Sequence, residues 1–247
     1  MKLVFENADD FKRSVDAIAT LIDEAEFVVD DKALSLKATD PSQISMVDFK
    51  VEKKAFKEFD VKETVRLGMD FDYLAQVMSR AKAKEQLELE LAEDKSYLHV
   101  VFRGASNRRF RVPLIDVSSS ELPSPKIDFD AGVVLRAGVL QEALKDASLV
   151  SSHVTVGVDA RNFFVRAVSS KGSLNNETSK DDKNVFELSA KKQCQAMFPL
   201  DYLSDMLKVP AVDSRIELSM KTDAPIRVSY AIGNAQITYY LAPRIEA

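Results

Sequence analysis

Few residues in this chain are of the types that carry out chemistry, and their spacing assembles no catalytic centre. The 247 residues include two histidines, His99 and His153, and one cysteine, Cys194. No paired-histidine spacing is present, and a single cysteine cannot build a zinc cluster. The three serines at 118–120 have no evident base nearby and are typical of a linker. We therefore expect no catalytic residue and no metal site.

Nucleotide-binding loops are also missing from the sequence. Neither GxGxxG nor GxxxxGK[ST] occurs, and the chain has only seven glycines. Carboxylates are plentiful but are spread along the strands, which is typical of solvated faces. The sequence therefore predicts a protein that is not an enzyme and needs no cofactor.

Composition bounds the class of protein. Hydrophobic residues make up 46% and charged residues 30%, as in ordinary soluble globular proteins. One cysteine allows no intrachain disulfide, which fits a reducing intracellular compartment. We expect no signal peptide and no membrane span, because acids interrupt the first residues and no run approaches ~18 apolar residues. The net charge of −5 argues against a simple nucleic-acid coat, although the placement of cations matters more than their sum.

The elements that would position any site occur twice. Asp72-Tyr73-Leu74 recurs 129 positions later as Asp201-Tyr202-Leu203. The same offset aligns a second, longer set of mostly apolar positions with its counterparts: Phe11, Val15, Ile18, Phe27, Val29, Asp30, Leu34, Leu36 and Ala38 with Leu140, Leu144, Ala147, Val156, Val158, Asp159, Phe163, Val165 and Ala167. This constant offset predicts a duplicated domain. We expect one domain at 1–115, an extended linker at 116–130 and the second domain at 131–247.

Each half is predicted to begin with an amphipathic helix and to continue in alternating strands. The first helix buries Phe11, Val15 and Ile18 behind an Asn7 cap, and Asp30 to Lys32 form a hairpin turn. A second helix opens at Asp70 or Asp72, and its counterpart spans 199–208. Leucines alternate with glutamates over 87–91, which predicts a strand with one buried face and one wet face. The fold class is α+β, with two helices per domain packed on antiparallel sheets.

All four helices carry cations at their polar faces. The first has Lys12 and Arg13, and the third has Lys145. Arg80 ends the second helix, with Lys82 and Lys84 beyond it, and Lys208 ends the fourth. Such side chains can contact phosphates without reading bases. Asp201 and Asp205 on the fourth helix count against a uniformly basic surface.

The order and identity of several segments match a known family. Residues 34–47 read LSLKATDPSQISMV, residues 111–117 read RVPLIDV, and residues 239–246 read YYLAPRIE. With these motifs the whole chain resembles proliferating cell nuclear antigen, the sliding clamp of archaea and eukaryotes. The archaeal members are the more similar, through 111–117 and through ALKDASLV at 143–150.

The resemblance implies a head-to-tail homotrimer in which a duplicated DNA-clamp domain assembles into a ring. Helices would line the hole and contact duplex DNA without sequence preference, and the ring would tether a polymerase as a processivity factor in replication and repair. The implied DNA-binding residues are Lys12, Arg13, Arg80, Lys82, Lys84, Lys145 and Lys208.

In the family, edge strands of neighbouring subunits pair across the joint. One edge would be 108–112, and the other would lie within 173–183, where the sequence is very polar. We therefore expect backbone pairing to contribute more than apolar contact. Charged groups from both halves would add to the joint, and the implied interface residues are Lys82, Lys84, Arg108, Arg109, Phe110, Arg111, Glu142 and Asp146.

Family partners carry a short peptide motif that docks beside the linker and the C-terminal tail. DNA polymerase, the clamp loader, flap endonuclease and ligase are the implied partners. The implied pocket residues are Gln43, Ile44, Met46, Leu122, Pro123, Ile127, Pro225, Tyr240, Ala242 and Pro243.

Two other functions remain open at this stage. The chain could be one subunit of a heterotrimeric clamp. From a different class, it could be an oligomeric enzyme or small-molecule binder on a duplicated α+β domain, which a glycine-rich loop or a base beside a nucleophile would favour. The resemblance favours an intracellular, cytoplasmic protein associated with the nucleoid.

Overall fold

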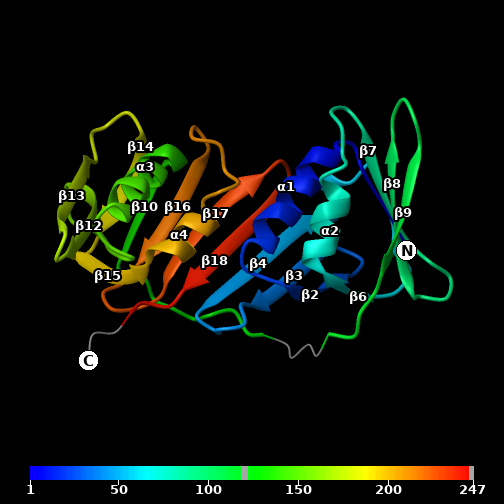
Figure 1. Cartoon of the computed structure of the whole chain (residues 1–247), viewed down its shortest axis with the longest axis horizontal. Helices are drawn as coiled ribbons and strands as arrows, with labels where there is room; N and C mark the ends of the chain where they lie inside the picture. Colours follow the sequence, from blue (N-terminus) through cyan, green and yellow to red (C-terminus); the bar gives the residue numbers. More distant parts are fainter. Residues whose placement is uncertain (118–121, 245–247) are drawn as a thin grey trace. The chain divides into compact units, whose positions relative to one another are not determined.

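The chain folds into two compact units, each built from helices and antiparallel strands. A computed structural model describes residues 1–117 and 122–244 (Figure 1). Unit 1 comprises Met1–Pro123 together with Ile232–Ile237, and unit 2 comprises Ser124–Ala231 together with the described residues from Thr238 onward. Serines 118–120, which the sequence assigns to the linker, and the last residues of the YYLAPRIE motif lie outside the described residues.

Unit 1 contains two helices and two runs of antiparallel strands, in the orders β5-β1-β7-β8-β9 and β4-β3-β2-β6. Its elements are β1 (Lys2–Phe5), α1 (Ala8–Ala19), β2 (Glu24–Val29), β3 (Ala33–Thr39), β4 (Ser45–Glu52), η1 (Lys53–Ala55), β5 (Glu58–Asp60), β6 (Val65–Asp70), α2 (Phe71–Met78), β7 (Gln86–Leu91), β8 (Tyr97–Arg103) and β9 (Arg108–Pro113).

Apart from η1, unit 2 repeats this order element by element, with strand orders β14-β10-β16-β17-β18 and β13-β12-β11-β15. Its elements are β10 (Ala131–Arg136), α3 (Ala137–Ser148), β11 (His153–Val158), β12 (Asn162–Ser169), β13 (Gly172–Ser179), β14 (Val185–Ala190), β15 (Cys194–Pro199), α4 (Leu200–Met206), β16 (Arg215–Met220), β17 (Ile226–Ile232) and β18 (Ala235–Leu241). The tip of the β17–β18 hairpin, Ile232–Ile237, belongs to unit 1. The matching orders confirm the duplicated α+β fold that the 129-residue offset predicts.

In each unit the two helices lie side by side, α1 with α2 and α3 with α4 (Figure 1). Aromatic rings join α1 to strands of both runs in unit 1. The Phe11 ring lies 4.8 Å from that of Phe5 on β1 and 6.0 Å from that of Phe27 on β2. Since Phe11 and Phe27 are only 2% exposed, burial of apolar area holds the helix pair on the strands.

Polar side chains fix where the helices of unit 1 begin. The Asn7 side chain accepts a hydrogen bond from the Asp9 amide at 3.1 Å, which confirms the predicted cap of α1. Asp70, rather than Asp72, caps α2 and accepts from the Tyr73 amide at 2.9 Å. The helices of unit 2 have no side-chain cap bond, so the duplication preserves helix position but not capping chemistry.

Two expectations about strands were wrong. Each half begins with a strand, β1 or β10, and not with a helix. Glu88 on β7 does not lie on a wet face, because β1 and β8 flank this strand and Glu88 is 4% exposed. Its carboxylate binds the Arg103 guanidinium at 2.9 Å and lies 3.8 Å from the Lys2 amine. An ion pair therefore makes burial of a charged residue possible at this position.

No helix among the described residues combines the length and the apolarity needed to cross a bilayer.

Equivalent hairpin turns in the two units are stabilised by the same pattern of side-chain hydrogen bonds. The Asp30 carboxylate accepts the backbone amides of Lys32 and Ala33 at 2.8 and 2.9 Å. Asp159, 129 positions later, accepts those of Arg161 and Asn162 at 2.7 and 2.8 Å. Hydrogen bonds from these amides, that of Lys32 and that of Arg161 first, lower the pKa of both carboxyl groups.

Replacing either aspartate with alanine should lower the free energy of unfolding by about 1 kcal/mol near neutral pH, because two amides lose an acceptor. Each pKa is lower in the folded state, so this stability is present above the unfolded pKa of about 4 and is lost as the pH falls through the folded pKa. Urea unfolding of Asp30→Ala and Asp159→Ala at pH 7 and pH 3 should show a difference from wild type that shrinks in acid.

Asp31→Ala is the matched control, because Asp31 is exposed in the same turn. Equal losses in Asp30→Ala and Asp31→Ala, or a difference from wild type that grows in acid, would contradict the role of the turn.

Candidate nucleic-acid interface and strand edges

Lysines on three helices are already paired with carboxylates of the same helix or its end. Lys12 binds Asp16 on α1 at 2.9 Å, and Lys145 binds Glu142 on α3 at 2.6 Å. Lys208, just after α4, binds Asp205 at 2.5 Å. Arg13, beside Lys12, is half-buried. Exposed pairs of this kind contribute only about 0–1 kcal/mol each, so a phosphate group can compete for the lysine.

The segment after α2 carries a different arrangement of cations. Arg80, Lys82 and Lys84 have exposed side chains, and none of the three forms an ion pair with a described residue. Lys84 has a φ of 66°, in the left-handed region, so the chain turns sharply between the helix and β7. The segment after α2 thus presents three exposed cations within five positions.

A buried ion pair holds that segment in place. The Arg108 guanidinium on β9 binds the Glu85 carboxylate at 2.5 Å and donates to the Arg80 carbonyl at 2.8 Å. The same carboxylate accepts the Lys82 amide at 2.8 Å, and Glu85 is 5% exposed. Arg108, which the sequence assigns to a subunit joint, thus points back into unit 1. It fixes the backbone that carries Arg80 and Lys82.

β9 and β13 are two of the six strands that stand at the end of a sheet, with a neighbour on one side only, in the described chain. β9 pairs with β8, and β13 pairs with β12. The β13 strand falls within the region expected to supply a second edge. On β9, Phe110 is half-buried against Phe102, and Arg111 lies 4.1 Å from the centre of the Tyr97 ring. Arg109 is exposed and 3.4 Å from Glu90, a weak contact that leaves its charge available.

The β13 edge is less polar than its sequence indicates. Val168 on β12 is 74% exposed and pairs with Ser173 of β13. Leu149, which ends α3, is 78% exposed, and the Val150 carbonyl next to it accepts the Ser169 hydroxyl at 2.7 Å. Both apolar side chains therefore lie near the same edge. Sequence reasoning missed them, although Val168 is an apolar residue at a position where alternation calls for a polar one.

The acids expected at a joint lie on α3 of unit 2. Glu142 and Asp146 are both exposed and stand one helical turn apart. Lys145 reaches Glu142 but leaves its carboxylate at the surface.

Candidate peptide-binding residues occur in both units. In unit 1, Gln43 and Ile44 lie in the turn between β3 and β4, and Met46 follows at the start of β4. The buried Asp40 carboxylate holds this turn and accepts the amides of Ser42 at 3.0 Å, Ile44 at 3.0 Å and Ser45 at 2.7 Å. Gln43 is exposed with a φ of 58°, and Ile44 and Met46 are half-buried. This turn is rigid and presents two apolar side chains at its rim.

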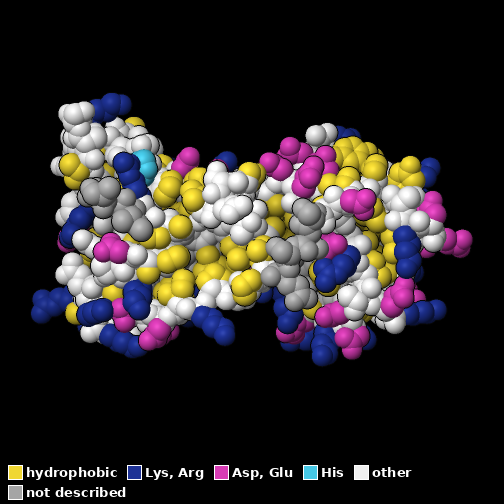
Figure 2. All heavy atoms as spheres, turned by 90° about the horizontal axis from the view of Figure 1, so that it is seen from below, with side chains coloured by type: hydrophobic (Ala, Val, Ile, Leu, Met, Phe, Trp, Pro, Cys, Tyr) yellow, Lys and Arg dark blue, Asp and Glu magenta, His cyan; other side chains and the backbone are white. Residues whose placement is uncertain are grey.

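The remaining candidates flank the linker or lie in unit 2. Leu122 is half-buried and Pro123 is exposed. Half-buried side chains are presented by Ile127, Pro225, Tyr240, Ala242 and Pro243. Figure 2 shows apolar side chains, in yellow, gathered on one face. Arg244 connects the C-terminal tail to unit 2. Its amide donates to the Met197 carbonyl at 2.7 Å, and its guanidinium lies 3.2 Å from the His153 ring.

Within the described residues, no group of three or more histidine, cysteine, aspartate or glutamate side chains is arranged to hold a metal ion.

Comparison with known proteins accounts for the whole chain. Residues 1–122 match the N-terminal domain of proliferating cell nuclear antigen, and residues 124–245 match its C-terminal domain. The DNA polymerase sliding clamp of Methanococcus maripaludis is 34% identical over 98% of both chains. That of Pyrococcus furiosus is 31% identical over 99% of this chain and 98% of its own.

Solved structures agree with the fold. PCNA from Thermococcus kodakaraensis superposes with a TM-score of 0.95 at 24% identity, covering 98% of this chain and 99% of its own. PCNA of A. fulgidus, solved with the C-terminal region of FEN-1 bound, has a TM-score of 0.89 at 27% identity and covers 100% of this chain and 99% of its own.

Proposed function

Because the chain belongs to the proliferating cell nuclear antigen family along its whole length and is a DNA polymerase sliding clamp, we propose that three identical copies close into a ring around duplex DNA. The observation that carries this proposal is the duplicated unit in which β9 and β13 are among the strands that end a sheet and have no second neighbour in the described chain. A head-to-tail contact between unlike edges closes into a ring when its rotation is suitable. The ring holds DNA by topology, so its contacts with the phosphates can be weak.

We propose that β9 of one copy pairs with β13 of the next. Backbone hydrogen bonds satisfy both edges, and Phe110, Leu149 and Val168 supply apolar area beside them. Lys82, Lys84 and Arg109 face Glu142 and Asp146 across the joint, while Arg111 lies along the paired strand. Arg108 acts through Glu85, by holding the backbone of the segment that presents Lys82.

Introducing charge at the apolar edge should break the ring. Leu149→Glu and Val168→Glu each place an unpaired carboxylate in the joint. The free-energy cost of burying that charge exceeds the stabilisation from the edge contacts. Light scattering at micromolar concentration should give three times 27.5 kDa for wild type and 27.5 kDa for the double variant.

Val212→Glu is the matched control, since Val212 is 64% exposed but lies in the loop before β16, outside the joint. A double variant that keeps the wild-type mass would contradict the proposed joint at the β13 edge. A wild-type monomer that assembles only with a paralogous chain would instead indicate a heterotrimer.

We propose that the DNA-facing cations are Lys12, Arg13, Arg80, Lys82, Lys84, Lys145 and Lys208, with Arg80 contributing most. Arg80 has no ion pair in the described chain, whereas Lys12, Lys145 and Lys208 each release a carboxylate before they meet a phosphate. The paired carboxylates keep the helix surface close to neutral, which suits a protein that must slide.

Arg80→Ala should weaken binding to a short linear duplex more than Lys145→Ala does. Each lost phosphate contact reduces the magnitude of the slope of log K against log salt concentration by about 0.9. A trimer that loses one contact per copy would therefore lose up to about 3 from that slope. Fluorescence anisotropy from low to moderate salt measures both slopes, with the trimer mass checked for each variant. Equal slopes for the two variants would show that the local carboxylates do not matter.

We propose that partner proteins dock through a short peptide on Gln43, Ile44, Met46, Leu122, Pro123, Ile127, Pro225, Tyr240, Ala242 and Pro243. DNA polymerase, the clamp loader, flap endonuclease and ligase are the expected partners. The support is the rigid β3–β4 turn and its half-buried apolar rim. The chain itself supplies no catalysis, and it acts inside the cell on chromosomal DNA.

A peptide with glutamine followed by an aliphatic residue and two aromatic residues should bind wild type at micromolar strength, roughly −8 kcal/mol. Ile44→Glu should abolish that binding in calorimetry while the trimer persists, because a carboxylate replaces part of the apolar rim. Val212→Glu should bind as wild type does. Unchanged affinity in Ile44→Glu would place the pocket elsewhere.

A further inference from the structure

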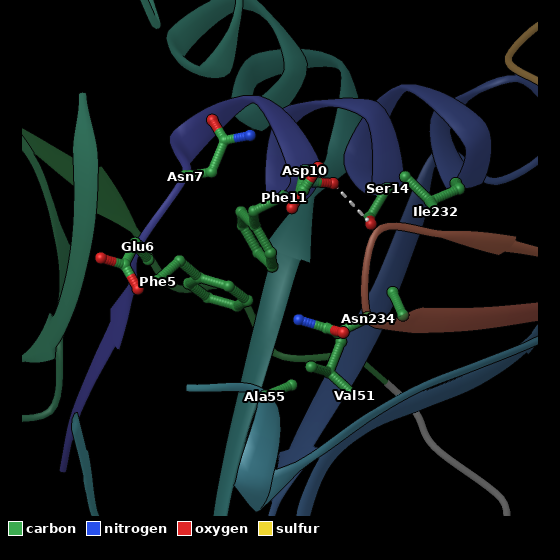
Figure 3. A pocket seen from close by; sticks show the side chains of 11 residues that line it. Phe5, Glu6, Asn7, Asp10, Phe11, Ser14, Val51, Ala55, Ile232 and Asn234 are labelled. Carbon is green, nitrogen blue, oxygen red and sulfur yellow. Dashed lines mark hydrogen bonds between the residues drawn. The ribbon is translucent and has the colours of Figure 1, made fainter. Parts of the chain in front are cut away.

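A cavity of about 240 Å³ lies beside the start of α1 in unit 1 (Figure 3). The rings of Phe5 and Phe11, whose centres are 4.8 Å apart, form one wall, and Val51 and Ile232 add aliphatic surface. The start of α1 lies away from the segment that leads into the linker (Figure 1). None of the residues that line the cavity belongs to the surfaces proposed for DNA, subunit or peptide contact.

The polar part of the lining has only one sign of charge. Asp10 and Glu6 contribute carboxylates, and no lysine or arginine is among the lining residues. The Ser14 hydroxyl, also in the lining, donates to the Asp10 backbone carbonyl at 2.8 Å and not to its carboxylate. Burial, and then the neighbouring Asp9, raises the pKa of Asp10, and the positive charge of Arg13 offsets part of that rise.

The tip of the β17–β18 hairpin passes close to this carboxylate. Gly233 has a φ of 55°, and a Cβ built on it would lie 2.6 Å from the Asp10 carboxylate. Glycine, which has no Cβ and tolerates a positive φ, allows that approach. The hairpin thus forms a fixed wall opposite the phenyl rings, and the cavity is a preformed space with a negative rim.

We propose that this cavity binds a small organic cation, an amidinium or ammonium group on a flat hydrophobic body. The cationic head would meet the Asp10 carboxylate, and the body would lie against Phe5 and Phe11, whose ring faces attract positive charge. A pocket with an apolar wall and a few convergent polar groups is the usual form of a small-molecule site. This inference does not depend on the ring or on its DNA contacts.

Benzamidine and its neutral isostere benzamide are suitable probes. Calorimetry and saturation-transfer NMR on the full chain should show saturable binding of one benzamidine per chain, at least tenfold tighter than benzamide. Asp10→Asn keeps the size of the side chain and should erase that tenfold preference. Asp9→Asn should retain it, because Asp9 is exposed in the same turn and does not line the cavity.

Ala55→Leu should weaken both probes, since it fills the space itself. Thermal melting checks that each variant is folded. Equal affinity for benzamidine and benzamide, loss of the preference in Asp9→Asn, or no saturable binding to a folded wild type would each overturn the proposal.

Discussion

Backbone hydrogen bonding at two strand edges is the constraint on which the account depends. β9 and β13 each have a neighbour on one side in the described chain, so each presents a row of amides and carbonyls on the other. Such edges are liabilities unless another strand covers them. Exposed Leu149 and Val168 beside β13, and Phe110 on β9, are apolar side chains where an isolated protein would place charge. Pairing β9 with β13 of another copy satisfies both edges with one contact.

The edge strand and the cationic segment are parts of one rigid arrangement. Arg108 lies on β9 and binds the Glu85 carboxylate. That carboxylate also accepts the Lys82 amide, and the Arg108 guanidinium donates to the Arg80 carbonyl. Glu85 is buried, so removing either member of the pair leaves an uncompensated charge. In the proposed ring, a change at the joint would therefore reach the cations assigned to DNA through these two side chains.

Local and periodic signals made much of the fold predictable. The Asp30 and Asp159 turns, the Asn7 cap and the positions of all four helices follow from rules that act over a few residues, and the duplication extends them to both units. Strand-to-strand context was harder to foresee. From the sequence, Glu88 is expected to be solvated. It can be buried because Arg103 and Lys2, which lie on neighbouring strands, are beside its carboxylate.

For the surfaces, too, the residue types could be predicted from the sequence, whereas their contacts and exposure could not. The cations at helix ends are visible in the sequence, but their pairing with Asp16, Glu142 and Asp205 is a matter of rotamers within one helical turn. Leu149 and Val168 were missed because their exposure depends on where α3 ends and which strand is last in its sheet. The cavity beside α1 includes residues from β1 and from the β17–β18 hairpin, more than 200 positions apart in the chain, which no local pattern joins.

Encirclement of DNA is the central claim, and retention on DNA of different topology tests it most directly. The protein would be placed on nicked circular duplex with a loading factor and freed of unbound protein by gel filtration. The DNA would then be cut once with a restriction enzyme. The account predicts that the protein stays with the circle at a salt concentration that abolishes simple electrostatic binding, and that it leaves within minutes of the cut by sliding off the ends. Equal retention on circular and linear DNA would contradict it.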